Sequence, residues 1–170
     1  LTAKSDYGKG SALTGVKINL EFIRANPTGP LHLGHTRWAA VGDALGRVLT
    51  AAGAQVTREF YINDRCNQMD LFGQSVEAVA LGNAVPENGY QGEYIKDLAQ
   101  EVVAQNSGIK ELFGDERFIA FREAAYKLQL KDQQRVLETF NTHFDVWFSE
   151  RSLHDQGAVE HGMEKLRAKG

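Results

Sequence analysis

Two histidines three residues apart, His32 and His35, are the side chains best placed to do chemistry in this chain. They follow a segment with two prolines and two glycines that joins a strand-like run, Val16 to Ile23, to a helix-like run beginning near Gly34. A helix N-terminus presents unpaired backbone N–H groups and partial positive charge, so it attracts anions. Imidazole donors at this place suit a phosphate whose charge grows during a reaction. The segment therefore predicts a nucleotide-phosphate site, whereas a histidine at a helix start, taken alone, is usually structural.

The elements that must position these histidines follow from the hydrophobic pattern. Apolar and polar residues alternate from Val16 to Phe22, which predicts a strand, and the run Gln55 to Ile62 predicts a second. A helix that ends at Gly53 separates them, so the β–α–β order favours a parallel sheet with ligands at the carboxyl ends of its strands. One apolar stripe marks this helix: Trp38, Val41, Leu45, Val48 and Ala52.

The rest of the chain is predicted to be mostly helical. The expected helices are Met69–Leu81, Tyr90–Gln105, Arg117–Phe148 and Asp155–Lys169. Helical spacing of large aromatic residues favours core packing over a base-stacking platform, and these residues are Trp38, Phe140, Phe144, Trp147 and Phe148.

Polar side chains cluster where the two predicted strands end. Glu21 lies on the polar face of the first strand, and a carboxylate matches the planar fork of a guanidinium group. Asn26 follows this strand, while Asn63, Asp64 and Gln68 follow the second. The alternative roles are a solvated strand carboxylate for Glu21, turn chemistry for Asn26 and a helix N-cap for Asp64.

Three segments resemble the arginyl-tRNA synthetases, a family of class I aminoacyl-tRNA synthetases. They are residues 21–35, in which His32-Leu33-Gly34-His35 is similar to the HIGH motif of class I, residues 61–68 and residues 144–151. The resemblance implies an α/β fold: the first half of a Rossmann-like class I synthetase nucleotide-binding fold, with additional α-helices. We expect residues 1–15 to be an irregular N-terminal segment and residues 16–170 a partial catalytic domain.

The resemblance also implies an activity, arginine–tRNA ligase. L-arginine and ATP, with Mg²⁺, would give arginyl-adenylate, and the arginyl group would pass to tRNA(Arg). The implied catalytic residues are His32 and His35, which would bind ATP together with Gly34 and Pro30. The implied arginine contacts are Glu21, Asn26, Asn63 and Gln68.

Some features depart from the family or leave alternatives open. Cys66 stands where the family usually has a small residue, most often glycine, and it lacks a neighbouring base that would make it a nucleophile. The run from Pro27 to Gly34 also resembles glutamyl-tRNA synthetases, but Glu21 would repel a glutamate side chain. A third possibility is a fragment that binds ligand without turnover. No lysine loop of the KMSKS type occurs, and we expect the isolated chain to be inactive.

Composition narrows the class of protein. The chain has 170 residues, 42% of them hydrophobic and 24% charged, as in globular proteins, with no stretch typical of a signal peptide or membrane span. Its single cysteine fits a reducing cytoplasm. The net charge of −3 gives no sign of a nucleic-acid surface, so tRNA as a partner rests on the resemblance alone. No Cys/His cluster has zinc spacing, and the remaining histidines are expected on helix surfaces: His143, His154 and His161.

Overall fold

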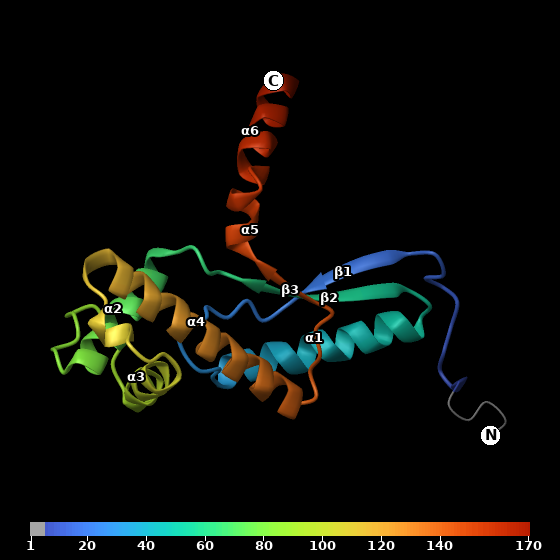
Figure 1. Cartoon of the computed structure of the whole chain (residues 1–170). Helices are drawn as coiled ribbons and strands as arrows, with labels where there is room; N and C mark the ends of the chain where they lie inside the picture. The colour runs from blue at the N-terminus through green and yellow to red at the C-terminus, as the bar shows by residue number, and fades with distance from the viewer. Residues whose placement is uncertain (1–5) are drawn as a thin grey trace. The chain divides into compact units, whose positions relative to one another are not determined.

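The structure, a computed structural model, describes residues 6–170 (Figure 1). Its contacts divide the chain into two compact units: unit 1 comprises the residues up to Ala25, His32–Ile62 and Leu137–Gly170, and unit 2 comprises Asn26–Leu31 and Asn63–Val136. In chain order the elements are β1 Lys17–Glu21, α1 Leu33–Ala51, β2 Gln55–Ile62, α2 Asn67–Leu81, α3 Glu93–Gln105, the 3-10 helix η2 Ile109–Glu111, α4 Gly114–Thr139, β3 Val146–Ser149, α5 Glu150–Asp155 and α6 Ala158–Lys169.

The sequence predicts an irregular segment over residues 1–15, of which residues 1–5 lie outside the described residues. From residue 6 to residue 15 the chain forms turns. The backbone N–H groups of Gly10 and Leu13 donate to the carbonyls of Ala51 and Ala52, which ties this segment to the end of α1.

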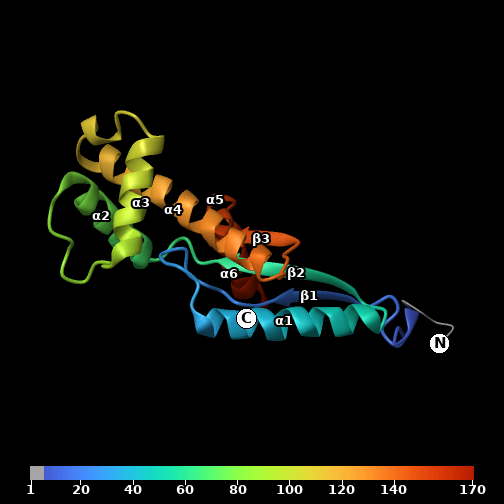
Figure 2. The ribbon, with the colours of Figure 1, turned by 90° about the horizontal axis from the view of Figure 1, so that it is seen from below.

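Unit 1 is built on a parallel sheet with the strand order β1-β2-β3. Lys17 pairs with Gln55 and Glu21 with Glu59, so the predicted strands, their direction and the α-helix between them are confirmed. Helix α1 lies along β1 and β2 in both views (Figures 1 and 2).

The predicted apolar stripe of α1 does not face the sheet. Trp38 is 59% exposed and Val48 is 64% exposed, while the buried residues of the helix are Ala39, Gly42 and Gly46. A Cβ atom on Gly42 would lie 2.2 Å from Cδ2 of Phe22, which is far inside van der Waals contact. Gly46 likewise lies against the guanidinium of Arg58, so α1 approaches the sheet with its smallest residues. Core packing of Trp38 was therefore a wrong prediction.

The segment after α4 corrects a second prediction. The expected helix up to Phe148 ends at Thr139, and Asn141 follows with a φ of +59° before β3 begins. The ring of Trp147 stacks on Phe60 with the centroids 4.5 Å apart, and the ring of Phe144 lies 4.5 Å from that of Phe22. Their predicted core packing is thus confirmed, but outside a helix.

The other two aromatic residues of this segment differ from each other. Phe140, which is 45% exposed, does not pack in the core, so that prediction was wrong. Phe148 lies on β3 and stacks on Tyr61 with the ring centroids 5.8 Å apart. A hydrogen-bonded pair fixes the start of β3: the Arg58 N–H donates to Asp145 Oδ2 at 2.7 Å, and the Asp145 N–H donates to the Arg58 carbonyl at 2.9 Å.

Unit 2 is helical, with one apolar core shared by α2, α3 and α4 (Figure 2). The predicted helices Met69–Leu81 and Tyr90–Gln105 are confirmed. Helix α2 starts two residues earlier, at Asn67, and α3 starts three residues later, at Glu93. The residues at the centre of the core are Phe72, Val76, Ile95, Val102 and Phe121.

The predicted last helix, Asp155–Lys169, is confirmed as α6 of unit 1 with a later start, at Ala158, and the short helix α5 before it was not predicted. Gly157 separates α5 from α6 with a φ of +65°, a left-handed conformation that side chains disfavour. Among the described residues, no helix is both long and apolar enough to cross a membrane.

Replacing glycine by alanine should change the free energy of unfolding in opposite directions at crowded Gly42 and at open Gly162. Gly42→Ala should lower the free energy of unfolding by about 1–3 kcal/mol, because the added methyl overpacks the core. Gly162→Ala on α6, where a Cβ would meet nothing within 4 Å, should raise it by about 0.5–1 kcal/mol through helix propensity. Urea denaturation followed by tryptophan fluorescence measures both. Equal stabilisation by the two variants would contradict the packing of α1.

Candidate active site

His32 and His35 bond reciprocally to the first turn of α1. His32 is the N-cap residue, and its Nδ1 accepts from the Gly34 N–H at 3.1 Å. His35, three residues on, accepts the His32 N–H through its own Nδ1 at 3.2 Å. The two rings stack with their centroids 3.8 Å apart. The pair thus fills a capping box in which imidazoles replace the usual hydroxyl and carboxylate.

This geometry fixes the tautomer of both rings. Because each Nδ1 accepts from a backbone N–H, each neutral ring must carry its proton on Nε2. Burial, and then the positive charge of a protonated His32, lower the pKa of His35 from its ordinary value. The arrangement therefore supplies two neutral N–H donors at a helix N-terminus, where partial positive charge is also present.

Gly34 allows the ring of His32 to fold back on the helix. A Cβ atom at Gly34 would lie 2.9 Å from Cε1 and 3.1 Å from Nδ1 of His32, closer than ordinary contact. Glycine at this position is therefore a requirement of the cap.

Glu21, the last residue of β1, faces a guanidinium group of its own chain. Its Oε1 lies 3.2 Å from Nε of Arg24, and the Arg24 Cζ lies 5.2 Å from the centroid of the Tyr61 ring. The Glu21 side chain remains 37% exposed. The carboxylate thus pairs with a guanidinium of its own chain. Its contact with substrate arginine stays a prediction.

Three other predicted site residues come together in unit 2. The Asn26 amide donates to Oε1 of Gln68 and accepts from Nδ2 of Asn63 at 3.2 Å. Asn26 and Asn63 are partly buried, whereas Gln68 is exposed. These amides form one hydrogen-bonded row, with Asn26 in the middle. Pro30, also in unit 2, is exposed.

Two residues that the sequence did not single out hold the loop from Asn26 to Leu31. Nε2 of Gln133, on α4, donates to the carbonyls of Asn26 at 3.0 Å and Gly29 at 2.8 Å. The hydroxyl of Tyr94, on α3, donates to the Thr28 carbonyl at 3.2 Å, and burial raises its pKa to about 12. The only sequence signal was a polar residue within a predicted helix, and Gln133 is 1% exposed.

Two neighbouring residues have structural roles. Asp64 is not an N-cap, contrary to one of the roles considered for it: it is 1% exposed and its Oδ2 accepts the hydroxyl of Tyr126 at 2.9 Å. Cys66 is the N-cap residue of α2, and its Sγ lies 3.8 Å from the Asn63 carbonyl. No group of three or more histidine, cysteine, aspartate or glutamate residues in the described chain could bind a metal ion.

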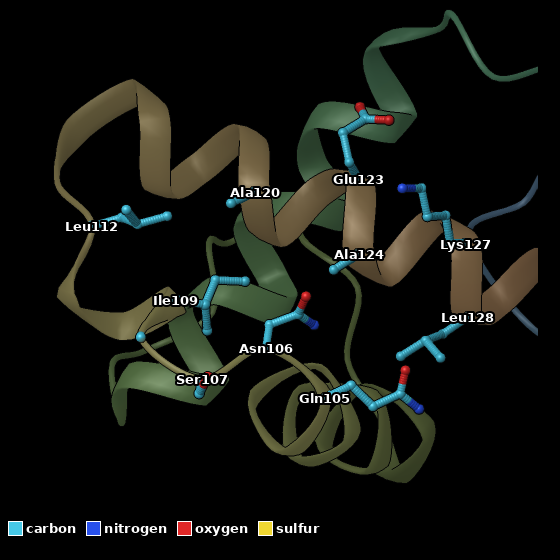
Figure 3. A pocket seen from close by; sticks show the side chains of 11 residues that line it. Gln105, Asn106, Ser107, Ile109, Leu112, Ala120, Glu123, Ala124, Lys127 and Leu128 are labelled. Atoms are coloured by element: carbon cyan, nitrogen blue, oxygen red, sulfur yellow. The ribbon is translucent and has the colours of Figure 1, made fainter.

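A separate hollow of about 440 Å³ lies within unit 2, where the end of α3 and η2 meet α4 (Figure 3). Apolar side chains, among them Ile109 and Leu128, line it together with polar ones such as Asn106 and Lys127. It contains none of the site residues predicted from the sequence.

The chain matches a protein family over residues 1–154, the family described as tRNA synthetases class I (R), catalytic domain. This match covers most of the chain, so the chain belongs to the catalytic-domain family of class I tRNA synthetases. The curated relatives that it matches are arginine–tRNA ligases. The chain is 51% identical over 168 residues to an arginine–tRNA ligase of Paenarthrobacter aurescens (strain TC1) and 53% identical over 168 residues to one of Renibacterium salmoninarum. These alignments cover 99% of this chain and 31% of each relative.

Solved structures agree with this assignment. A candidate arginyl-tRNA synthetase of Campylobacter jejuni superposes with a TM-score of 0.84 at 36% identity, over 98% of this chain and 37% of the other. The arginyl-tRNA synthetase of Thermus thermophilus has a TM-score of 0.64 over 94% of this chain and 28% of its own, and at 19% identity it shows a shared fold. The predicted fold class, a Rossmann-like class I synthetase fold with additional helices, is confirmed.

The lowered pKa of His35 predicts a loss of stability in acid. The unfolded chain takes up a proton near pH 6.5, above the folded pKa, so this contribution is full above about pH 6.5 and is lost as the pH falls toward the folded value. His35→Gln keeps an acceptor for the capping box but cannot titrate, so its stability should fall less between about pH 7.5 and pH 5.5. Urea midpoints at both pH values, followed by tryptophan fluorescence, measure the difference.

The matched control for this experiment is His161→Gln, on the exposed surface of α6. It should keep the pH dependence of the unsubstituted chain. The same flattening in both variants would show that the cap does not cause it.

The contacts of Gln133 predict a stability loss in unit 2. Gln133→Leu keeps the volume but leaves two carbonyls without their donor, so the free energy of unfolding should fall by about 1–3 kcal/mol. Gln100→Leu, on the exposed face of α3, should change it by less than about 0.5 kcal/mol. Urea denaturation followed by circular dichroism compares the two. A Gln133→Leu protein as stable as the control would remove Gln133 from the support of this loop.

Proposed function

We propose that this protein takes part in the reaction of an arginine–tRNA ligase: ATP-dependent activation of L-arginine to arginyl-adenylate, followed by transfer to tRNA(Arg). The observation that carries the proposal is the pair of neutral imidazoles at the N-terminus of α1. The names of the relatives supply the substrates, and the chain spans about a third of their length.

In the first step the carboxylate oxygen of arginine attacks the α-phosphorus of ATP. An O–P bond forms, the bond to the β-phosphate oxygen breaks, and pyrophosphate leaves with the electron pair. His32 and His35 donate through Nε2 to phosphate oxygens whose charge grows in the transition state. No protein nucleophile is needed, because the step depends on position and charge stabilisation.

The ATP contacts proposed here come from the start of α1. His32 and His35 would offer their Nε2–H groups to phosphate, and Gly34, which has no side chain, would let a flat adenine ring approach the backbone. Pro30 would line the path of the same ligand. Mg²⁺ would bind through the ATP phosphates, as this ion commonly does, and would neutralise their charge.

The arginine contacts proposed here are one carboxylate and three amides. Glu21 would accept the guanidinium of the substrate, since its carboxylate already pairs with a guanidinium in this structure. Asn26, Asn63 and Gln68 would supply amide donors and acceptors to the polar groups of arginine. The single free cysteine is consistent with work in a reducing cytoplasm.

Titration calorimetry of the chain tests the substrate. Arginine should bind more tightly than lysine or glutamate, and Glu21→Gln should weaken arginine binding by about 1–3 kcal/mol, because a charge-assisted pair becomes neutral. The matched control is Glu164→Gln on the exposed surface of α6, which should leave the affinity unchanged. Unchanged arginine affinity in a folded Glu21→Gln protein would remove Glu21 from the site.

The isolated chain should not charge tRNA at a useful rate. Its relatives carry about two-thirds of their length outside the aligned segment, and contributors to one transition state rarely act independently. The assay combines the chain with ATP, magnesium, radiolabelled arginine and total tRNA, and the full-length Paenarthrobacter aurescens relative is the positive control. Turnover near that of the control would show that these 170 residues contain the complete catalytic apparatus.

A further inference from the structure

The carboxylate proposed to recognise the substrate already has a guanidinium partner in the same chain. Arg24 Nε lies 3.2 Å from Glu21 Oε1, three residues back. The Arg24 Cζ also lies over the ring of Tyr61, 5.2 Å from its centroid, which is a cation–π distance. Arg24 therefore makes the two contacts with which a protein commonly recognises the side chain of arginine.

The backbone bends to bring Arg24 to this place. Ile23 and Arg24 have φ values of +78° and +53°, in the left-handed region that side chains other than glycine rarely adopt. For a β-branched residue such as Ile23 this conformation is strained. Two consecutive residues of this kind directly follow Phe22, and they turn the chain so that the Arg24 side chain returns to the end of β1.

The sheet presents more negative charge at this point than Glu21 alone. Glu21 pairs in register with Glu59 on β2, so both carboxylates point from the same face of the sheet. Tyr61 is two residues beyond Glu59 and shares that face. Like charges directly opposite each other in a sheet repel, and a guanidinium relieves the repulsion.

We propose that Arg24 is an internal competitor for the guanidinium site formed by Glu21, Glu59 and Tyr61, and that substrate arginine binds by displacing it. This inference rests on the proposed function, because it takes arginine as the substrate and Glu21 as its acceptor. A ligand must then exchange one guanidinium for another at the same carboxylate. Arginine can match the contacts that it displaces, whereas lysine offers a point charge without the planar fork. Because both ligands must displace Arg24, it lowers the apparent affinity for each of them by the same factor.

The Arg24 side chain is 64% exposed, so its pairing with Glu21 is a weak and reversible one. Pairs of this kind are populated only modestly over their open form. The apparent affinity of a ligand is its intrinsic affinity multiplied by the fraction of molecules in which the site is open. Removal of the guanidinium should therefore tighten arginine binding by about two- to fivefold.

The experiment is titration calorimetry of the chain with arginine and with lysine in four folded proteins. Arg24→Asn removes the guanidinium and suits the left-handed backbone, because asparagine tolerates positive φ. Lys17→Gln is the control for charge. It removes one positive charge from the strand and the sheet face that carry Glu21, but Lys17 is not the ion-pair partner of Glu21. The remaining two proteins are Glu21→Gln and the double variant Glu21→Gln/Arg24→Asn. Arg24→Gln replaces Arg24→Asn if the latter does not fold.

The expected result has three parts. Arginine binds about two- to fivefold more tightly to Arg24→Asn and with unchanged affinity to Lys17→Gln. Lysine binding tightens by the same factor, so the ratio of arginine to lysine affinity stays unchanged in Arg24→Asn, because both ligands lose the same competitor. In the Glu21→Gln background the Arg24 substitution changes nothing, which is the signature of a shared partner.

Two different failures are distinguishable. If Glu21→Gln weakens arginine binding but Arg24→Asn does not tighten it, the proposed function stands and the competitor role is overturned. If arginine binding is absent or independent of Glu21 in all four proteins, the proposed function and this inference are both overturned. Equal tightening by Arg24→Asn and Lys17→Gln would show a general effect of charge, and it would also overturn the competitor role.

Discussion

The close approach of Gly42 to Phe22 is the contact on which unit 1 depends. The Phe22 ring occupies the place that a Cβ at position 42 would need, and on its other side it meets Phe144, which in turn contacts Phe60 and Trp147. One glycine thus lets a helix, a strand and a distant aromatic segment share a single layer of rings. The direction of α1, and with it the backbone N–H groups at its start, follows from this fit.

Much of unit 1 could be predicted from local sequence, because its signals are local. Alternation identified β1, and the predicted bounds of β2, Gln55 and Ile62, are those of the structure. What periodicity could not supply was which face of α1 is buried. The apolar stripe with Trp38 and Val48 is exposed, whereas small residues face the sheet, since Gly42 and Gly46 leave room for large side chains at the sheet. The strand β3 was missed because its start depends on a bond between Asp145 and Arg58, which are 87 residues apart.

The candidate site also has features that the sequence could predict and features that it could not. The place of the two histidines at the start of a helix could be predicted. Their tautomer could not, because it follows from which backbone N–H group each Nδ1 accepts. The amide row of Asn26, Asn63 and Gln68 agrees with the prediction that these residues gather. Asp64 had the right residue type for a cap, yet it serves as the buried acceptor of Tyr126, a partner on another helix. Gln133 carried only a weak local signal, a polar residue within a predicted helix, because its two acceptors lie more than a hundred residues away.

The fork of hydrogen bonds from Gln133 has a consequence for the order of events during synthesis. Its two acceptors, on Asn26 and Gly29, lie 107 and 104 residues earlier in the chain. The ribosome therefore makes His32 and His35 long before it makes Gln133, the residue that holds the loop from Asn26 to Leu31. Closing a loop of this length has an entropic cost and belongs to the slower, non-local part of folding. The loop from Asn26 to Leu31 consequently gains these two hydrogen bonds only after α4 has been made, so a nascent chain carries the histidine motif well before this loop is held in place.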